Sequence, residues 1–190
     1  MMDVNVFVAG PRALSTLDKN VEERLNNIIK QNITVLVGDA NGIDKSMQQY
    51  FYRENYRNLL VYDSKGKARN NIGNWPVQTV EVADNIKGFD FYAAKDLKMA
   101  ENADYGLMLW NGISKGTLNN IINLTKQNKK ALIYYTPHKK FYCVNSLDIA
   151  KKLAALCGDK ASNLFSDLSE TDGNLSISDD SEQISLFGNR

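Results

Sequence analysis

The feature that most constrains the fold is an alternation of short apolar runs with longer amphipathic segments along the 190-residue chain. The runs are rich in β-branched and aromatic residues, which is typical of buried strands. The longer segments repeat apolar residues at helical spacing, as Val21, Leu25 and Ile28 do. Parallel strands need a crossover to return the chain, so this alternation predicts a mostly parallel sheet with helices on both faces. We therefore expect a single α/β domain with a Rossmann-like fold.

The same pattern assigns the expected elements to definite ranges. Strands are expected at residues 4–9, 34–37, 59–62, 79–82, 105–110 and 131–135, the last of which closes the sheet. Helices are expected in the segment that begins at Asp18 and at 43–54, 89–102, 116–128 and 146–156. The polar stretch 64–76 is either a lid over a site or an ordinary surface loop.

Composition and charge exclude several classes of protein. Lys and Arg total 23 against 22 Asp and Glu, so no global positive field draws the chain to nucleic acid or to an anionic membrane. We expect DNA to be bound weakly or only through a partner. The chain shows no leader peptide and no long apolar stretch, which predicts a cytoplasmic protein without a membrane partner. Cys143, Cys157 and the single His138 cannot form a metal site by themselves, so neither a metal nor a resident cofactor is expected.

Three glycine-bearing loops follow expected strands, at residues 10–12, 38–44 and 111–117. The carboxyl ends of parallel strands meet at one edge of the sheet, where helix N-termini favour phosphate. The loops therefore predict one ligand-binding cleft. Its candidate ligand-binding residues are Gly10, Arg12, Gly38, Asn41, Gly42, Gly112, Ser114, Lys115, Gly116 and Thr117. No loop matches the Walker pattern or GxGxxG, which disfavours a P-loop ATPase or an ordinary NAD dehydrogenase.

Candidate catalytic residues are Asp39, Asp44 and Asp104, because an aspartate in a dry cleft can activate water or stabilise positive charge. Each charged candidate has a structural alternative. Arg12 and Lys115 either grip a phosphate or are solvated loop residues. Asp44 either acts as an acid or base or favours a helix dipole, and Asp104 is either a catalytic acid or a turn residue.

Four segments in a fixed order carry a family resemblance. They are Gly10-Pro11-Arg12; Gly38-Asp39-Ala40-Asn41-Gly42-Ile43-Asp44-Lys45; Lys95-Asp96 with Met99 ahead of Ala103-Asp104; and Trp110-Asn111-Gly112-Ile113-Ser114-Lys115-Gly116-Thr117. Together they resemble the SLOG superfamily over residues 3–135. These are Rossmann-like nucleotide-binding proteins related to the cytokinin phosphoribohydrolases called LOG and to the DNA-processing protein DprA. Within the superfamily, the chain is most similar to the small YspA-like branch.

The resemblance implies that the chain binds a nucleotide or nucleotide-derived small molecule, with phosphate at Gly116-Thr117. Some relatives hydrolyse or transfer at an N-glycosidic bond and carry a GTxxE pattern, whose glutamate helps catalysis. This chain has Asn120 at the glutamate position, so an enzyme of this kind would need an acid from Asp39, Asp44 or Asp104. The alternative is a non-catalytic nucleotide-sensing or DNA-associated adaptor. Pairing into a homo-oligomer is also left open.

The composition shifts after the last expected helix. We expect a Rossmann-like domain at 1–157 and a flexible acidic tail at 158–190. The tail ends in Gln183-Ile184-Ser185-Leu186-Phe187, which resembles the peptide that binds the bacterial β sliding clamp. Gln183, Ile184, Leu186 and Phe187 would make the contacts, and a clamp would be the partner. The alternative is an amphipathic end that docks onto its own domain.

Overall fold

The computed structural model describes residues 3–171. Their centre is a sheet whose strands lie in the order β4-β3-β2-β1-β5-β6-β7. The strands are β1 (Asn5–Ala9), β2 (Thr34–Gly38), β3 (Leu59–Ser64), β4 (Val77–Val80), β5 (Tyr105–Trp110), β6 (Lys130–Tyr135) and β7 (Lys140–Val144). Strands β1 to β6 pair in parallel, and β7 runs antiparallel to β6.

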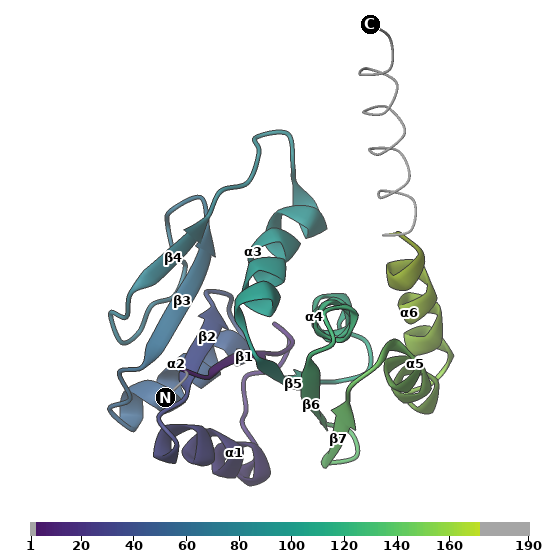
Figure 1. Ribbon diagram of the computed structural model, residues 1–190, viewed down its shortest axis with the longest axis horizontal. Coiled ribbons are helices and arrows are strands. Elements are labelled where there is room, and N and C mark those ends of the chain that lie inside the picture. The colour runs from purple at the N-terminus through teal and green to yellow at the C-terminus, as the bar shows by residue number, and fades with distance from the viewer. Residues whose placement is uncertain (1–2, 172–190) are drawn as a thin grey trace, which may run out of the picture.

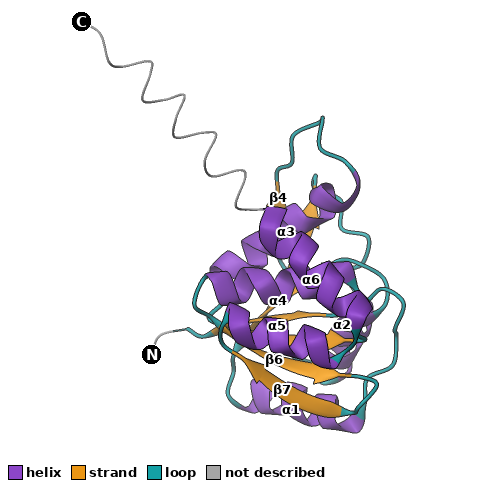
Figure 2. Ribbon diagram, turned by 90° about the vertical axis from the view of Figure 1, so that its right-hand side faces the viewer, coloured by secondary structure: helices purple, strands orange, loops and turns teal. Residues whose placement is uncertain are grey.

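Helices cover both faces of this sheet (Figure 1). They are α1 (Lys19–Lys30), α2 (Ile43–Arg53), α3 (Gly88–Asn102), α4 (Lys115–Lys126), α5 (Leu147–Leu156) and α6 (Asp159–Thr171). Helices α1 and α2 lie on one face, and α3 and α4 on the other. Helices α5 and α6 extend the second layer beside α4, which contacts both of them (Figure 2). The prediction of a mostly parallel, Rossmann-like α/β fold is therefore confirmed.

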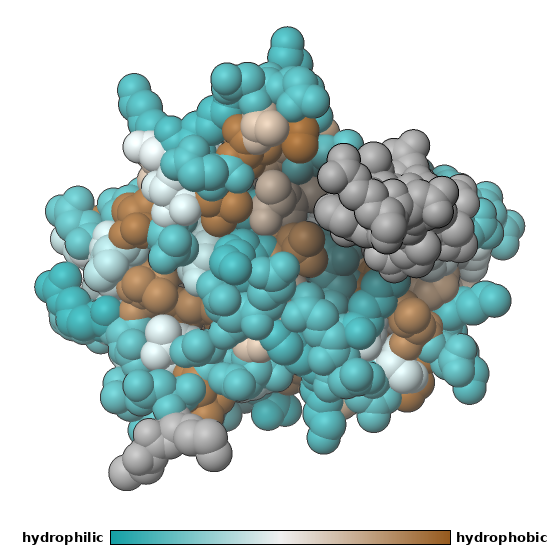
Figure 3. Space-filling model, turned by 45° about the horizontal axis from the view of Figure 1, so that its top comes forward, coloured by the Kyte–Doolittle hydropathy of each residue, from teal (hydrophilic) through white to brown (hydrophobic). Residues whose placement is uncertain are grey.

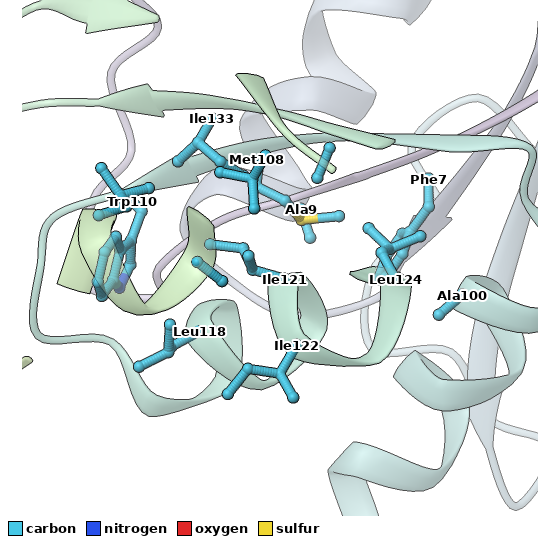
Figure 4. Packing of buried hydrophobic residues seen from close by; sticks show 14 of the residues in the cluster. Phe7, Ala9, Ala100, Met108, Trp110, Leu118, Ile121, Ile122, Leu124 and Ile133 are labelled. Carbon is cyan, nitrogen blue, oxygen red and sulfur yellow. The ribbon is translucent and has the colours of Figure 1, made fainter. Parts of the chain in front are cut away.

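Each face of the sheet has its own hydrophobic core, because a parallel sheet between two helical layers is buried on both sides. Side chains alternate along β1: Val6 and Val8 pack towards α1 and α2, whereas Phe7 packs towards α3 and α4. Figure 4 shows the second core, in which Ile121 and Leu124 of α4 lie close to buried side chains of the sheet. Burial on both faces explains why the strands read as continuous apolar runs.

Two elements lie where the sequence predicts none, and one strand is displaced. Strand β4 spans Val77–Val80 rather than 79–82. Strand β7 was missed because its sequence, KFYCV, begins with a lysine and much of it stays partly exposed at the sheet edge. The prediction of a tail from residue 158 was wrong for residues 159–171, which form α6. Ala161, Phe165 and Leu168 recur at helical spacing and are buried against α4 and α5, although polar residues dominate this segment.

The expected clamp-binding residues Gln183, Ile184, Leu186 and Phe187 lie outside the described residues. Across residues 3–171, none of the helices combines the length and the hydrophobicity that a membrane crossing requires.

Candidate ligand-binding site

A cavity of about 570 Å³ lies where the strand order reverses, and we call it the main cavity. Strand β2 pairs with one edge of β1, and β5 pairs with the opposite edge of β1. The loops after β1 and β5 therefore diverge, and such a switch point is the usual ligand site of an open α/β sheet. The volume falls within the range of small-molecule sites, roughly 300–1,000 Å³. The face of the molecule that Figure 3 turns towards the viewer is mostly hydrophilic, with hydrophobic residues in separate patches.

The structure brings several of the expected ligand-binding residues together with Asp44, one of the catalytic candidates. Gly10, Arg12, Asp44, Ser114, Lys115, Gly116 and Thr117 all line the main cavity. Gly38, Asp39, Asn41, Gly42 and Gly112 belong to the same loops but do not line it. The loops after β1, β2 and β5 thus supply residues to one cavity, and the remaining glycines shape those loops from outside it.

The start of α4 forms one wall of the main cavity. Ser114 is the N-cap, and its Oγ accepts a hydrogen bond from the Thr117 backbone N–H at 3.4 Å. Asn111 holds the preceding turn, since its Oδ1 accepts from the backbone N–H groups of Ile113 at 3.1 Å and Ser114 at 2.9 Å. A Cβ placed on Gly116 would meet no atom within 4 Å, so the backbone there borders open space. The arrangement suits an anion at a helix N-terminus.

Asn120 lies one turn further along α4 and also lines the main cavity. Its exposed fraction is 3%, yet within residues 3–171 its Oδ1 has no hydrogen-bond partner. A buried carbonyl oxygen without a donor costs about 1–3 kcal/mol, so such groups are rare in proteins. Asn120 is the residue at the position where the family resemblance described above expects the glutamate of a GTxxE pattern.

A buried group of charges forms the floor of the main cavity. Lys95 is 3% exposed, and its Nζ donates to Asp96 Oδ1 at 2.8 Å. Asp44 lies nearby: a Cβ on Gly38 would stand 2.5 Å from Asp44 Oδ2 and 2.8 Å from Lys95 Nζ. Gly38 is therefore the residue whose missing side chain leaves room for both groups beneath the cavity.

The two buried groups have perturbed proton affinities. Burial raises the pKa of Asp44 to about 7, although the nearby Lys95 ammonium opposes the rise. Burial alone would lower the pKa of Lys95, but the carboxylates of Asp96 and Asp44 raise it above its usual value. Near neutral pH, the floor therefore combines a lasting positive charge with a carboxyl group that can gain or lose a proton.

Asp39, expected as a catalytic residue, is held in an ion pair with Arg69 instead. Asp39 Oδ1 accepts from Arg69 Nη2 at 2.8 Å, and Oδ2 accepts from Arg69 Nε at 3.1 Å and from its backbone N–H at 3.0 Å. Burial acts to raise the pKa of Asp39, but these hydrogen bonds bring it below the usual value. With both oxygens occupied, Asp39 anchors the 64–76 segment rather than facing the main cavity.

Asn41 takes part in the same attachment. Asn70 Nδ2 donates to Asn41 Oδ1 at 3.0 Å and to the Asp39 backbone carbonyl at 2.8 Å. Gln48 of α2 donates to the Asn70 carbonyl at 3.1 Å and accepts from the Ile72 backbone N–H at 3.1 Å. The 64–76 segment is thus pinned to the loop after β2 and to α2, and it contributes Arg69 to the cavity wall.

Asp104 takes no part in the main cavity. It precedes β5, so it lies at the edge of the sheet where the parallel strands begin, opposite the ligand site. Its Oδ2 accepts from the Asn5 backbone N–H at 2.7 Å, and its own backbone N–H donates to the Asn5 carbonyl at 2.9 Å. Asp104 therefore joins the start of β5 to the start of β1.

Sequence reasoning missed several cavity residues, above all the aromatic start of α3. Phe89 and Tyr92 line the main cavity. Lys115 Nζ lies 4.2 Å from the Phe89 ring centroid, and the Arg12 guanidinium lies 5.5 Å from that of Tyr92. Two aromatic residues at the beginning of a helix carry no signal by themselves, because similar residues elsewhere in this chain belong to the core.

No protein-family model matches the chain, and no curated protein matches it. Among solved structures, the chain is similar to DNA processing protein A from Helicobacter pylori, which was studied for its single-stranded DNA binding mode. The TM-score is 0.54 and the sequence identity 11%, over 88% of this chain and 81% of the other. At that identity the likeness concerns the fold: this chain has the Rossmann-like architecture of DNA processing protein A.

Proposed function

We propose that the main cavity binds a nucleotide or nucleotide-derived small molecule, with its phosphate at the start of α4. The first turn of α4 offers backbone N–H groups to an anion, and Lys115 and Arg12 bring positive charge to the same wall. The aromatic rings of Phe89 and Tyr92 offer surfaces on which a base can stack.

The observation that carries the proposal is the unpartnered Oδ1 of Asn120. It is an acceptor, so its partner is a donor such as a sugar hydroxyl rather than a phosphate oxygen. Because the oxygen itself is buried, we expect the Asn120 side chain to turn towards the cavity when the ligand binds. A phosphorylated sugar meets both demands, because its phosphate accepts from the helix start while a hydroxyl donates one turn further along. A free phosphate satisfies only the first demand.

Calorimetric titration with a panel of nucleoside 5′-monophosphates tests this proposal. We expect Asn120→Ala to weaken binding by about tenfold, the loss of one well-made hydrogen bond. Asn123→Ala is the matched control, because Asn123 lies on the same helix but does not line the cavity. Absence of binding across the panel, or equal affinities for both variants and the parent chain, would refute the proposal.

A second candidate function is cleavage of an N-glycosidic bond, and the properties of Asp44 favour it. Water would add to the anomeric carbon as the bond from that carbon to the base breaks, and a protonated Asp44 would give its proton to the leaving base. The Asp44 carboxylate left behind would then take up the proton that the added water loses. A general acid works best when its pKa lies near the working pH, as that of Asp44 does. The asparagine at position 120 favours binding without turnover instead.

Release of free base, followed by mass spectrometry, distinguishes these two functions. For an enzyme, we expect product from the parent chain and none from Asp44→Asn, with nucleotide binding retained in both. Tight binding without any product would leave the chain as a nucleotide sensor.

We further propose that the C-terminal peptide recruits the protein to a bacterial β sliding clamp. The proposal rests on the sequence Gln183-Ile184-Ser185-Leu186-Phe187, and the fold shared with a DNA-processing protein is in keeping with a DNA-associated adaptor. Binding of purified clamp to the intact chain and to a version that ends at Glu182 tests it at matched salt. We expect binding in the micromolar range that truncation abolishes; equal binding or none in both would count against the clamp.

A further inference from the structure

A second, smaller cavity adjoins the main one, and we call it the side hollow. Its volume is about 180 Å³, and it is lined by Asp39, Ser64, Lys67, Arg69, Phe91 and Tyr92. Arg69 and Tyr92 line both cavities, so the two adjoin at these side chains, which we call the partition. A volume of this size is below the usual range for an independent ligand site, roughly 300–1,000 Å³, but it suits an extension of a neighbouring site.

The partition between the cavities consists of Arg69 and Tyr92, and neighbouring residues on both sides fix their positions. The Arg69 guanidinium lies 5.0 Å from the Tyr92 ring centroid and is fixed by its two side-chain hydrogen bonds to Asp39. Arg12 lies 5.5 Å from the same ring centroid. Tyr92 is 39% exposed, so the partition, together with Arg12, presents an aromatic ring and two guanidinium groups to a ligand that crosses it.

Positive charge continues beyond the partition. Lys67 is exposed, lines the side hollow and forms no ion pair with another described residue. Asp39, the acidic residue of the hollow, already has both oxygens occupied by Arg69. Lys67 therefore supplies an uncompensated positive charge next to a ring that a base can stack on, a combination typical of surfaces that follow a nucleotide chain.

We propose that the ligand carries a second phosphate beyond its first nucleotide unit, and that Lys67 and Arg69 bind this phosphate in the side hollow. The inference rests on the nucleotide-binding function proposed above and extends it. Its ligand class is a 5′-phosphorylated dinucleotide unit, with the terminal phosphate at the start of α4 and the linking phosphate across Tyr92. Such a unit is supplied either by a free dinucleotide or by the end of a single strand.

Calorimetry with a 5′-mononucleotide and the corresponding 5′-phosphorylated dinucleotide tests the inference. We expect the dinucleotide to bind about tenfold more tightly, because it adds one charge-assisted phosphate contact. Lys67→Ala should abolish this advantage and leave mononucleotide binding unchanged. Because Lys67 is exposed, we expect the substitution to leave the folded structure unchanged. Lys130→Ala is the control, since Lys130 is equally exposed but begins β6 at the opposite sheet edge.

The outcomes separate this inference from the proposed function. Equal affinity for the two ligands, or a dinucleotide advantage that survives Lys67→Ala, refutes the proposed phosphate site in the side hollow. Either result leaves the proposal of nucleotide binding in the main cavity intact. Failure of both ligands to bind overturns both proposals. A short single strand identifies the source: tighter binding than the dinucleotide assigns the site to strand ends, and weaker binding assigns it to free dinucleotides. A strand that binds equally well with and without its 5′-phosphate contradicts the inference.

Discussion

Replacing Gly38 by alanine tests the buried arrangement of Asp44 and Lys95 most directly. The new methyl group would stand 2.5 Å from Asp44 Oδ2 and 2.8 Å from Lys95 Nζ. Both groups are buried, at 6% and 3% exposure, so neither can move away into solvent. The substitution therefore forces the charged floor of the main cavity apart.

The expected size of the effect follows from two opposing contributions. Exchanging glycine for alanine at a permissive site stabilises a protein by about 0.4–1 kcal/mol, because the unfolded chain loses freedom. Overpacking a filled interior costs about 1–3 kcal/mol, and displacing Lys95 from its ion pair with Asp96 adds to that cost. We expect Gly38→Ala to lower the free energy of unfolding by about 1–3 kcal/mol.

Urea denaturation followed by circular dichroism measures this loss. Gly116→Ala is the matched control, since a Cβ there meets no atom within 4 Å and the residue lies in the first turn of α4. That control should be neutral or stabilised by up to about 1 kcal/mol. If Gly38→Ala proves as stable as Gly116→Ala, the close packing of Asp44 and Lys95 around Gly38 is not a feature of the folded protein.

Three further predictions address other parts of the molecule. The pKa of Asp44, about 7, lies above its ordinary value of 3.8, so the folded state holds a proton that the unfolded chain releases, and this contribution to stability is lost as the pH rises between those values. Between pH 5 and pH 8 the parent chain should therefore lose about 2–3 kcal/mol more unfolding free energy than Asp44→Asn, as denaturant titrations at the two pH values would show. Phe165→Ala should cost about 3–5 kcal/mol in the same assay, because Phe165 is 5% exposed and packs in the core; a negligible loss would mean that α6 is dispensable. Asp104→Ala should remove about 1 kcal/mol with the hydrogen bond to the Asn5 backbone, and its nucleotide affinity by calorimetry should equal that of the parent chain.

The sequence was sufficient to predict the fold because most strands and helices can be recognised from the spacing of apolar residues within each segment. Apolar runs such as 34–37 and 105–110 are long enough to mark buried strands, and the helices between them keep a clear period. Elements at the periphery lack such a signal. Strand β7 is short and partly exposed, and α6 has three buried apolar residues among many polar ones.

The site could be predicted only where it depends on loops that follow strands. Arg12, Asp44 and the 114–117 turn were found because the carboxyl ends of parallel strands share one edge. Arg69 was not, since it reaches the cavity through an ion pair to Asp39 across an irregular segment. Asp104 could have been excluded from the sequence, because it precedes the expected strand 105–110 and therefore lies at the end of the parallel strands opposite the loops.

The central position of β1 has a consequence for the order in which the chain can fold. Strand β1 pairs with β2, which follows it closely, but its other neighbour, β5, begins only at Tyr105. During synthesis, the β4-β3-β2-β1 half can assemble before β5 is available to pair with the free edge of β1. Contacts between residues this far apart in the sequence form slowly. Pulsed hydrogen exchange should therefore protect the amides of β2 before those of β5; simultaneous protection would show that the two halves fold as one unit. The ligand cavity lies on the seam between these halves, so it is complete only once the last long-range pairing has formed.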